Sequence, residues 1–111
     1  MIAATVSGTV AKDAELRSPR GAEQVLTFSV ASRRWANGQE VTDWVSVAMW
    51  GKRAVAIASH VTKGSRIAAR GALHVREYES NGAKRFSVEL RADDVELLGG
   101  RGQNGGNDAG F

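Results

Sequence analysis

The stretch TDWVSVAMWGK, Thr42 to Lys52, carries two of the three tryptophans in a chain of 111 residues. Successive side chains of a β-strand point to opposite faces. As a strand, this stretch places Val45, Val47 and Met49 on one face and both indoles on the other, with small residues between them. The aliphatic row has the character of a core. The pattern therefore predicts a half-buried strand with an aromatic outer face.

Other alternating segments, separated by turn residues, predict an all-β domain. We expect strands at about 2–10, 25–35, 42–52, 66–78 and 85–92, with a short closing segment at 95–98. An apolar row with helical spacing lies between the third and fourth strands: Ala54, Ile57, Ala58 and Val61. Gly64 is placed to end that helix. Five strands with one helix between the third and the fourth are the layout of a five-stranded OB-fold barrel.

Two Asn-Gly pairs, Asn37-Gly38 and Asn81-Gly82, suit the central positions of type I′ hairpin turns, which need positive φ. Such turns determine which residues pair across each hairpin, and the first register places Trp44 opposite Ala31. Directly paired residues share a face, so the aliphatic rows of the two strands also meet. A bulge at Gly71 would shift the second register. Each hairpin then has one apolar face and one aromatic and basic face.

The predicted outer face combines aromatic rings with cations. Unpaired bases stack on aromatic rings while cations follow the phosphates, so this combination suits single-stranded nucleic acid. The candidate binding residues are Trp35, Trp44, Trp50, Tyr78, Arg33, Arg70 and Arg76, with Arg34 and Lys52 adjacent in sequence. Duplex recognition favours a helix that enters a groove, and the one expected helix has no basic row. Two alternatives stay open: the tryptophans belong to the core, or the surface binds a protein.

Composition limits the other functional classes. Fifteen Lys and Arg stand against twelve Asp and Glu, so polyanion binding depends on whether the cations share a face. The chain has no cysteine, and its two histidines, His60 and His74, lack metal-ligand spacing. We therefore expect no metal, no cofactor and no catalytic residues. No apolar run reaches the roughly 18 residues of a membrane span and no signal peptide is apparent, so we expect a cytoplasmic protein.

The composition changes near the C-terminus. Residues 100–111 are rich in Gly and Asn and offer only Ala109 and Phe111 as apolar groups. Such a segment cannot bury enough apolar surface to offset its ordering entropy. We expect a folded domain over residues 1–99 and a flexible tail over 100–111.

Several motifs resemble those of the bacterial-type single-stranded DNA-binding proteins, over about Val6 to Gly99. They are Gly8 with Asp13, Glu15 and Arg17, Thr42-Asp43-Trp44, Trp50-Gly51-Lys52, Lys63-Gly64-Ser65, Gly71-Ala72-Leu73 and Leu98-Gly99. The resemblance implies an OB-fold, usually a homotetramer, around which single strands wrap during replication, recombination and repair. It also implies the stacking positions, which are Trp35, Trp44, Trp50 and Tyr78. Lys52 and Lys63 match basic positions that hold the DNA backbone.

Two departures from the family leave its partners open. The family commonly docks replication and repair proteins through an acidic tail tip that ends in Phe, whereas this tail keeps Phe111 but has only one nearby acid, Asp108. Val45 stands where many members have a His near the subunit contact, so a dimer is the alternative to a homotetramer. The second candidate function is a primosomal replication protein, a dimer of the same fold that bridges single-stranded DNA and helicase-loading proteins. It would not need four stacking aromatics, so we expect a non-catalytic, sequence-independent binder of single-stranded DNA associated with the nucleoid.

Overall fold

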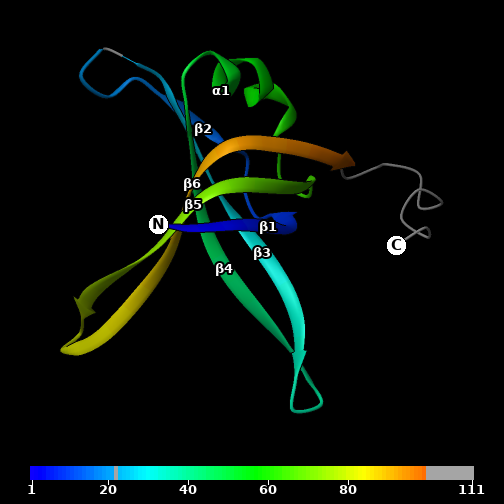
Figure 1. Ribbon diagram of the computed structural model, residues 1–111, viewed down its shortest axis with the longest axis vertical. Coiled ribbons are helices and arrows are strands. Elements are labelled where there is room, and N and C mark those ends of the chain that lie inside the picture. The colour runs from blue at the N-terminus through cyan, green and yellow to red at the C-terminus, as the bar shows by residue number, and fades with distance from the viewer. Residues whose placement is uncertain (22, 100–111) are drawn as a thin grey trace.

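Five long strands close into a barrel, and two hairpins extend from it as separate arms (Figure 1). The computed structural model describes residues 1–21 and 23–99, and the predicted tail, residues 100–111, lies outside them. The elements are β1 (Ile2–Val10), β2 (Glu15–Arg17), a 3₁₀ turn (Pro19–Gly21), β3 (Val25–Ala36), β4 (Gln39–Trp50), α1 (Lys52–Ile57), a second 3₁₀ turn (Ala58–His60), β5 (Arg66–Ser80) and β6 (Ala83–Gly99). The sheet order is β1-β5-β6-β4-β3-β2, and β1 also pairs with β3. The predicted OB-fold barrel is confirmed.

Both Asn-Gly turns form as predicted. Asn37-Gly38 has φ of 52° and 77°, and Asn81-Gly82 has φ of 53° and 75°, the positive values of a type I′ turn. The first hairpin keeps the predicted register along its whole length, with Ala31 opposite Trp44. The second keeps its predicted register from the turn as far as Gly71, where a bulge shifts the pairing. Local turn chemistry therefore sets which side chains share a face.

Two elements differ from the sequence prediction. The helix ends at Ile57 and continues only as a 3₁₀ turn, Ala58–His60. This tighter turn leads directly to Val61, which is buried in the core, while Gly64 lies in the following turn with φ of 91°. The prediction of a separate closing segment at 95–98 was wrong, because β6 runs without a break to Gly99. The bulge in the β5–β6 ladder absorbs the offset between the two halves of that strand.

No sequence pattern predicted β2, the strand Glu15–Arg17. It is only three residues long, and all three side chains are exposed. No apolar alternation could therefore reveal it. It pairs with the beginning of β3 at the edge of the sheet.

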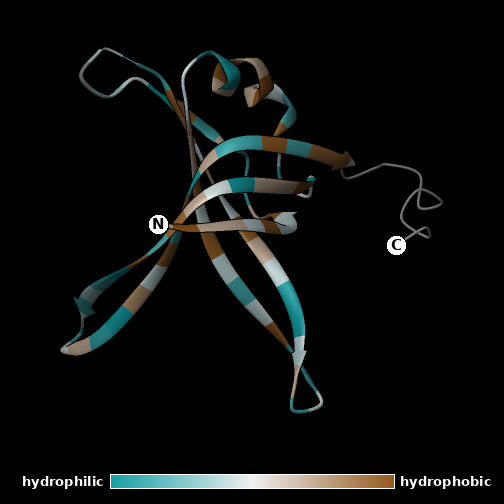
Figure 2. Cartoon of the chain, in the orientation of Figure 1, coloured by the Kyte–Doolittle hydropathy of each residue, from teal (hydrophilic) through white to brown (hydrophobic). Residues whose placement is uncertain are grey.

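The core fills the inside of the barrel. The predicted inward rows of β3 and β4 are all buried: Leu26, Phe28, Val30, Val45, Val47 and Met49. Figure 2 shows hydrophobic and hydrophilic residues interspersed along these strands. The helix covers one end of the barrel, where Ala54 and Val61 join the core cluster.

At two glycines the barrel wall has no room for a side chain. A Cβ at Gly8 of β1 would lie 2.3 Å from the carbonyl oxygen of Ala31 on β3. A Cβ at Gly71 would lie 2.0 Å from the carbonyl oxygen of Arg91, at the bulge of β5 against β6. Both obstacles are backbone atoms, which cannot move away by changing a rotamer.

We expect Gly8→Ala to lower the free energy of unfolding by about 1 to 3 kcal/mol, because the added methyl group would push β1 away from β3. Urea denaturation at a fixed protein concentration measures the loss. Ser7→Ala is the matched control, since Ser7 is the exposed neighbour on the same strand and its truncation should change stability by less than about 0.5 kcal/mol. Equal stability of Gly8→Ala and Ser7→Ala would contradict the close approach.

Candidate nucleic-acid interface

The four aromatic side chains predicted to bind bases all stand outside the barrel. Their exposed fractions are 73 % for Trp35, 57 % for Trp44 and 39 % each for Trp50 and Tyr78. None of the four belongs to the core cluster. The alternative that these rings are core residues is therefore wrong.

The three tryptophans follow one face of the β3–β4 ladder. Trp35 pairs with Glu40 near the turn of the arm, and Trp44 and Trp50 lie farther along β4. All three project to the same side, because residue 40 has the same parity as residues 44 and 50. At about 3.3 Å of rise per residue, this row of indoles extends for roughly 33 Å. Such a row can meet several bases of one extended strand.

Tyr78 lies on the other arm, which β5 and β6 form. It pairs with Arg85 across the hairpin, and the guanidinium carbon of Arg76 is 5.3 Å from the centroid of its ring. This distance is within the range of a cation–π contact. The second arm therefore presents an aromatic ring and a cation together.

A groove of about 510 Å³ crosses the outer face beside Trp50, and we call it the Trp50 groove. Parallel pairing of β4 with β6 forms it, because it sets Ser46 beside Glu89 and Ala48 beside Arg91. His74 also lines the groove and pairs with Glu89 across the β5–β6 ladder. Side chains from both hairpins therefore meet in one hollow.

The Trp50 groove is not basic. Its cationic side chains are Lys12 and Arg91, and its carboxylates are Asp13, Glu15 and Glu89. The aromatic face is therefore not a continuous cationic trough, and phosphate contacts must come mainly from outside this groove.

Glu89 is the centre of a polar network in the groove. Its carboxylate accepts a hydrogen bond of 3.0 Å from Nε of Arg76 and lies 2.8 Å from Nε2 of His74. Ser87 Oγ donates to the same carboxylate at 3.4 Å. The hydrogen bond from Arg76 is the main cause that holds the pKa of Glu89 below its usual value, against the opposing effect of burial. Glu89 is therefore an anion that forms an ion pair with Arg76.

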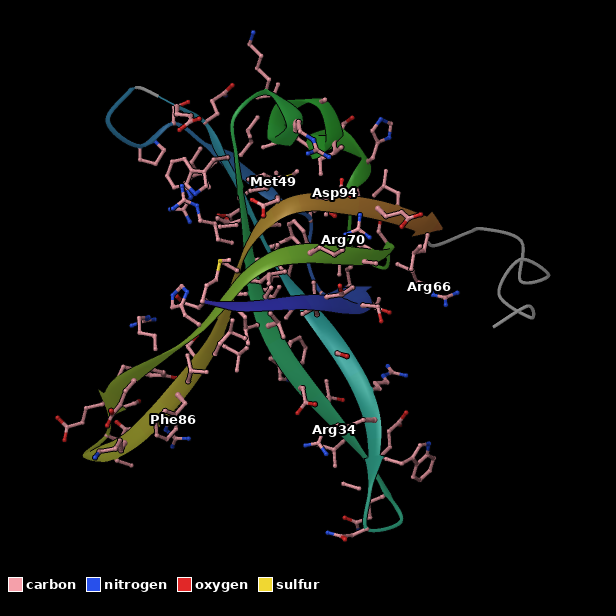
Figure 3. All side chains as sticks on the ribbon, in the orientation of Figure 1. Arg34, Met49, Arg66, Arg70, Phe86 and Asp94 are labelled. Carbon is pink, nitrogen blue, oxygen red and sulfur yellow. The ribbon has the colours of Figure 1, made fainter. Side chains whose placement is uncertain are left out.

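Two more of the predicted cations are bound by carboxylates. Arg34 donates from Nε to Oδ2 of Asp43 at 2.6 Å, which raises the pKa of Arg34. Its parity on β3 places it on the face opposite the tryptophans, far from Arg70 in Figure 3. Arg70 forms an ion pair with Asp94, which also binds Arg53. Arg34 and Arg70 thus have local structural partners.

The remaining predicted cations have no ion pair with a carboxylate in residues 1–21 and 23–99. They are Arg33, Lys52 and Lys63. Arg33 pairs with Thr42 across the ladder and so shares the tryptophan face. Lys52 begins α1, two residues after Trp50. The backbone N–H of Lys63 donates to Asp13 Oδ1 at 2.8 Å, which holds this turn beside the loop after β1.

Sequence reasoning missed four side chains of the groove: Lys12, His74, Glu89 and Arg91. The hairpin register already places His74 and Arg91 on the outer face, but it does not bring them near Trp50. Only the parallel β4–β6 pairing does so, and neither turn specifies that contact.

In the described parts of the chain, no group of three or more His, Asp or Glu side chains could hold a metal ion. Within those same ranges, no helix has the length and apolar character needed to cross a bilayer.

An OB barrel with exposed aromatic rings on its outer face has the architecture of a stacking platform for single strands. The sequence model described as "Single-strand binding protein family" matches residues 1–98. The chain is 34 % identical over 95 residues to single-stranded DNA-binding protein 2 of Streptococcus agalactiae serotype III, covering 84 % of this chain and 72 % of that protein. It is 36 % identical over 95 residues to the single-stranded DNA-binding protein of Clostridium tetani, covering 82 % and 66 %. The chain belongs to the single-strand binding protein family.

We expect Arg76→Gln to raise the pKa of Glu89 toward the usual value of about 4.3, because it removes the main hydrogen bond that lowers it. NMR titration of the side-chain carboxyl carbon measures the shift. A lowered pKa in the folded state stabilises the protein above the ordinary pKa, and this contribution is lost as the pH falls through the lowered value. The stability difference between wild type and variant should therefore shrink in acid. Lys84→Gln, which removes the cation bound to Glu77, should leave the Glu89 titration in place; an equal shift there would refute the assignment.

Proposed function

We propose that this protein binds single-stranded DNA without sequence preference and protects it during replication, recombination and repair. The observation that carries the proposal is the set of four exposed aromatic rings, three of them in line on one face. Every base has a π face, so a row of rings can bind any sequence. We also propose that it acts in the cytoplasm, by binding alone.

Phosphate neutralisation is the second part of the proposed mechanism. Arg33, Lys52 and Lys63 are the predicted cations without a carboxylate partner in the described residues, and they lie near the path of the rings or at the adjacent turn. Arg76 and Arg70 join the set if a phosphate displaces their carboxylates. Contact of Arg34 with a phosphate stays a prediction. Two observations argue against it: Arg34 is hydrogen-bonded to Asp43, and it lies on the face of β3 opposite the tryptophans.

Titration of the intrinsic tryptophan fluorescence with oligo(dT) tests the proposal. We expect strong quenching, since stacked bases contact the indoles directly. The logarithm of the affinity should fall linearly with the logarithm of the salt concentration, by about 0.7 for each phosphate neutralised. Unchanged emission at saturating oligo(dT) would instead favour a protein-interaction module of the same fold.

Trp50→Ala should weaken oligo(dT) binding by about 1 to 3 kcal/mol, the range measured for base stacking in proteins of this kind. Two controls separate stacking from general damage. Trp50→Phe keeps a π face and should retain most of the affinity. Val55→Ala truncates a comparably exposed side chain of α1 and should bind as the wild type does. A wild-type isotherm for Trp50→Ala would remove this residue from the site.

We further propose that the protein assembles with copies of itself, as a homotetramer. The inner apolar face of the barrel continues beyond the part that β4 covers, where Ile2, Val75 and Phe86 are more than half exposed. The register places all three on that one face, and Figure 3 shows Phe86 on the β5–β6 arm. β1 also pairs with β3 only at Thr9 and Val10. Gly8 lies against β3, whereas residues 2–7 have no β3 partner on that edge in the described chain, and another copy can pair with it.

Light scattering should give the mass of a tetramer, whereas the mass of a dimer would favour the primosomal alternative. Phe86→Glu should shift the protein to a smaller species at equal concentration, because a carboxylate cannot be buried there without a partner. Val55→Glu is the control: it adds the same charge at a similarly exposed apolar position on α1 and should leave the mass as it was. An unchanged mass for Phe86→Glu would exclude this face as the interface.

A further inference from the structure

The Trp50 groove presents an electrostatic conflict for a protein that binds a polyanion. Its three carboxylates outnumber its two Lys and Arg side chains. Like charges in close contact cost binding energy, so phosphates are disfavoured inside the groove. Yet Trp50, one of the four exposed rings that suit base stacking, lines the same hollow.

Glu89 is the carboxylate with the most specific position. Its backbone lies opposite Ser46 in the parallel β4–β6 pairing, its side chain is bonded to His74 and Arg76, and 27 % of that side chain is exposed. Its carboxylate accepts a hydrogen bond from Nε of Arg76, one of the five N–H donors of that guanidinium, and its negative charge offsets the positive charge that Arg76 would present to a phosphate. A cation already neutralised in this way adds little to the attraction of a second anion.

The rest of the groove lining suits bases. Thr27, Ser29 and Ser46 supply small side chains with hydroxyl groups that donate and accept hydrogen bonds, and Trp50 supplies a π face. Carboxylates accept hydrogen bonds from the amino and imino groups of bases, whereas phosphates have none to donate. The lining therefore accepts the base side of a strand more readily than its backbone.

We propose that Glu89 is a specificity-determining residue that keeps phosphates out of the Trp50 groove and so turns the bases of a bound strand inward. This inference rests on the proposed function and deepens it. Because the charge of Glu89 offsets that of Arg76, the groove does not attract polyanions in general. Affinity then depends on stacking, and polyanions that lack bases bind poorly.

The test compares oligo(dT) with an abasic deoxyribose-phosphate strand of equal length, in wild type and Glu89→Gln. Loss of the carboxylate frees Arg76 for one phosphate of the abasic strand. The salt slope for that strand should steepen by about 0.7, which at about 50 mM salt is roughly a five- to tenfold gain in affinity. Oligo(dT), whose bases already face the groove, should gain less than about twofold in affinity. The ratio of the oligo(dT) affinity to the abasic-strand affinity should therefore fall.

Glu77→Gln is the matched control for the change in net charge. Glu77 pairs with Lys84 at 3.2 Å, and its parity on β5 places it on the face opposite His74 and Arg76. That face also carries Phe86, so light scattering first checks that the variant keeps the wild-type mass. This variant should leave the ratio between the two probes unchanged. Equal gains for both probes in Glu89→Gln, or a ratio identical to that of Glu77→Gln, would overturn the proposal.

A double variant ties the effect to Arg76. In Glu89→Gln/Arg76→Gln the abasic strand should return to its wild-type affinity, while a persistent gain would overturn the role given to Arg76. Arg76→Gln alone leaves the Glu89 carboxylate without its cation and should weaken binding of the abasic strand more than that of oligo(dT). This measurement stands even if Glu89→Gln fails to fold, and an equal loss for both probes would overturn the proposal. The failures are distinguishable: wild type that binds no oligo(dT) refutes the proposed function, whereas tight oligo(dT) binding with an unchanged ratio refutes only the role of Glu89.

Discussion

The parallel pairing of β4 with β6 is the contact on which the rest of this structure depends. It is only four residue pairs long, from Val45–Val88 to Ala48–Arg91. It joins the two hairpins on one side of the barrel, while β1 joins them on the other by pairing with both β5 and β3, and it completes the barrel wall around Val47 and Leu90. Beyond it the two hairpins separate into arms (Figure 1). The pairing begins at Val45, so it sets where the barrel ends and the arms begin. Trp44 directly precedes this point and therefore lies at the base of the first arm.

The outer surface separates the two kinds of contact that a single strand needs. Aromatic rings are distributed along the arms and the barrel, and they can bind any base. The cations are divided instead: Arg34, Arg70 and Arg76 are held by carboxylates, while Arg33, Lys52 and Lys63 have no such partner in the described residues. A modest net charge of +3 fits this arrangement, because a surface with little net attraction for phosphates favours ligands that also stack.

Much of the fold was predictable because it is encoded locally. The Asn-Gly turns require positive φ, and the apolar alternation of β3 and β4 then permits a single register. The exposure of Trp35 and Trp44 followed from the same parity. Features that lack a local signal were not predictable. These are β2, with three exposed residues, and the continuous β6, which depends on how a bulge opposite Arg70 compensates its offset.

The sequence by itself determined the hairpins, the two faces of each strand and the aromatic character of the outer one, since backbone preferences and the two-residue period act over short distances. It also showed that the chain carries nearly as many acids as bases. Only the tertiary structure decided which charged groups meet between one hairpin and the next. Glu89 meets Arg76 through the second hairpin, but it joins Trp50 in one groove only because β4 lies beside β6. That pairing links residues more than forty positions apart, and burial of the whole barrel core, rather than any local pattern, stabilises it.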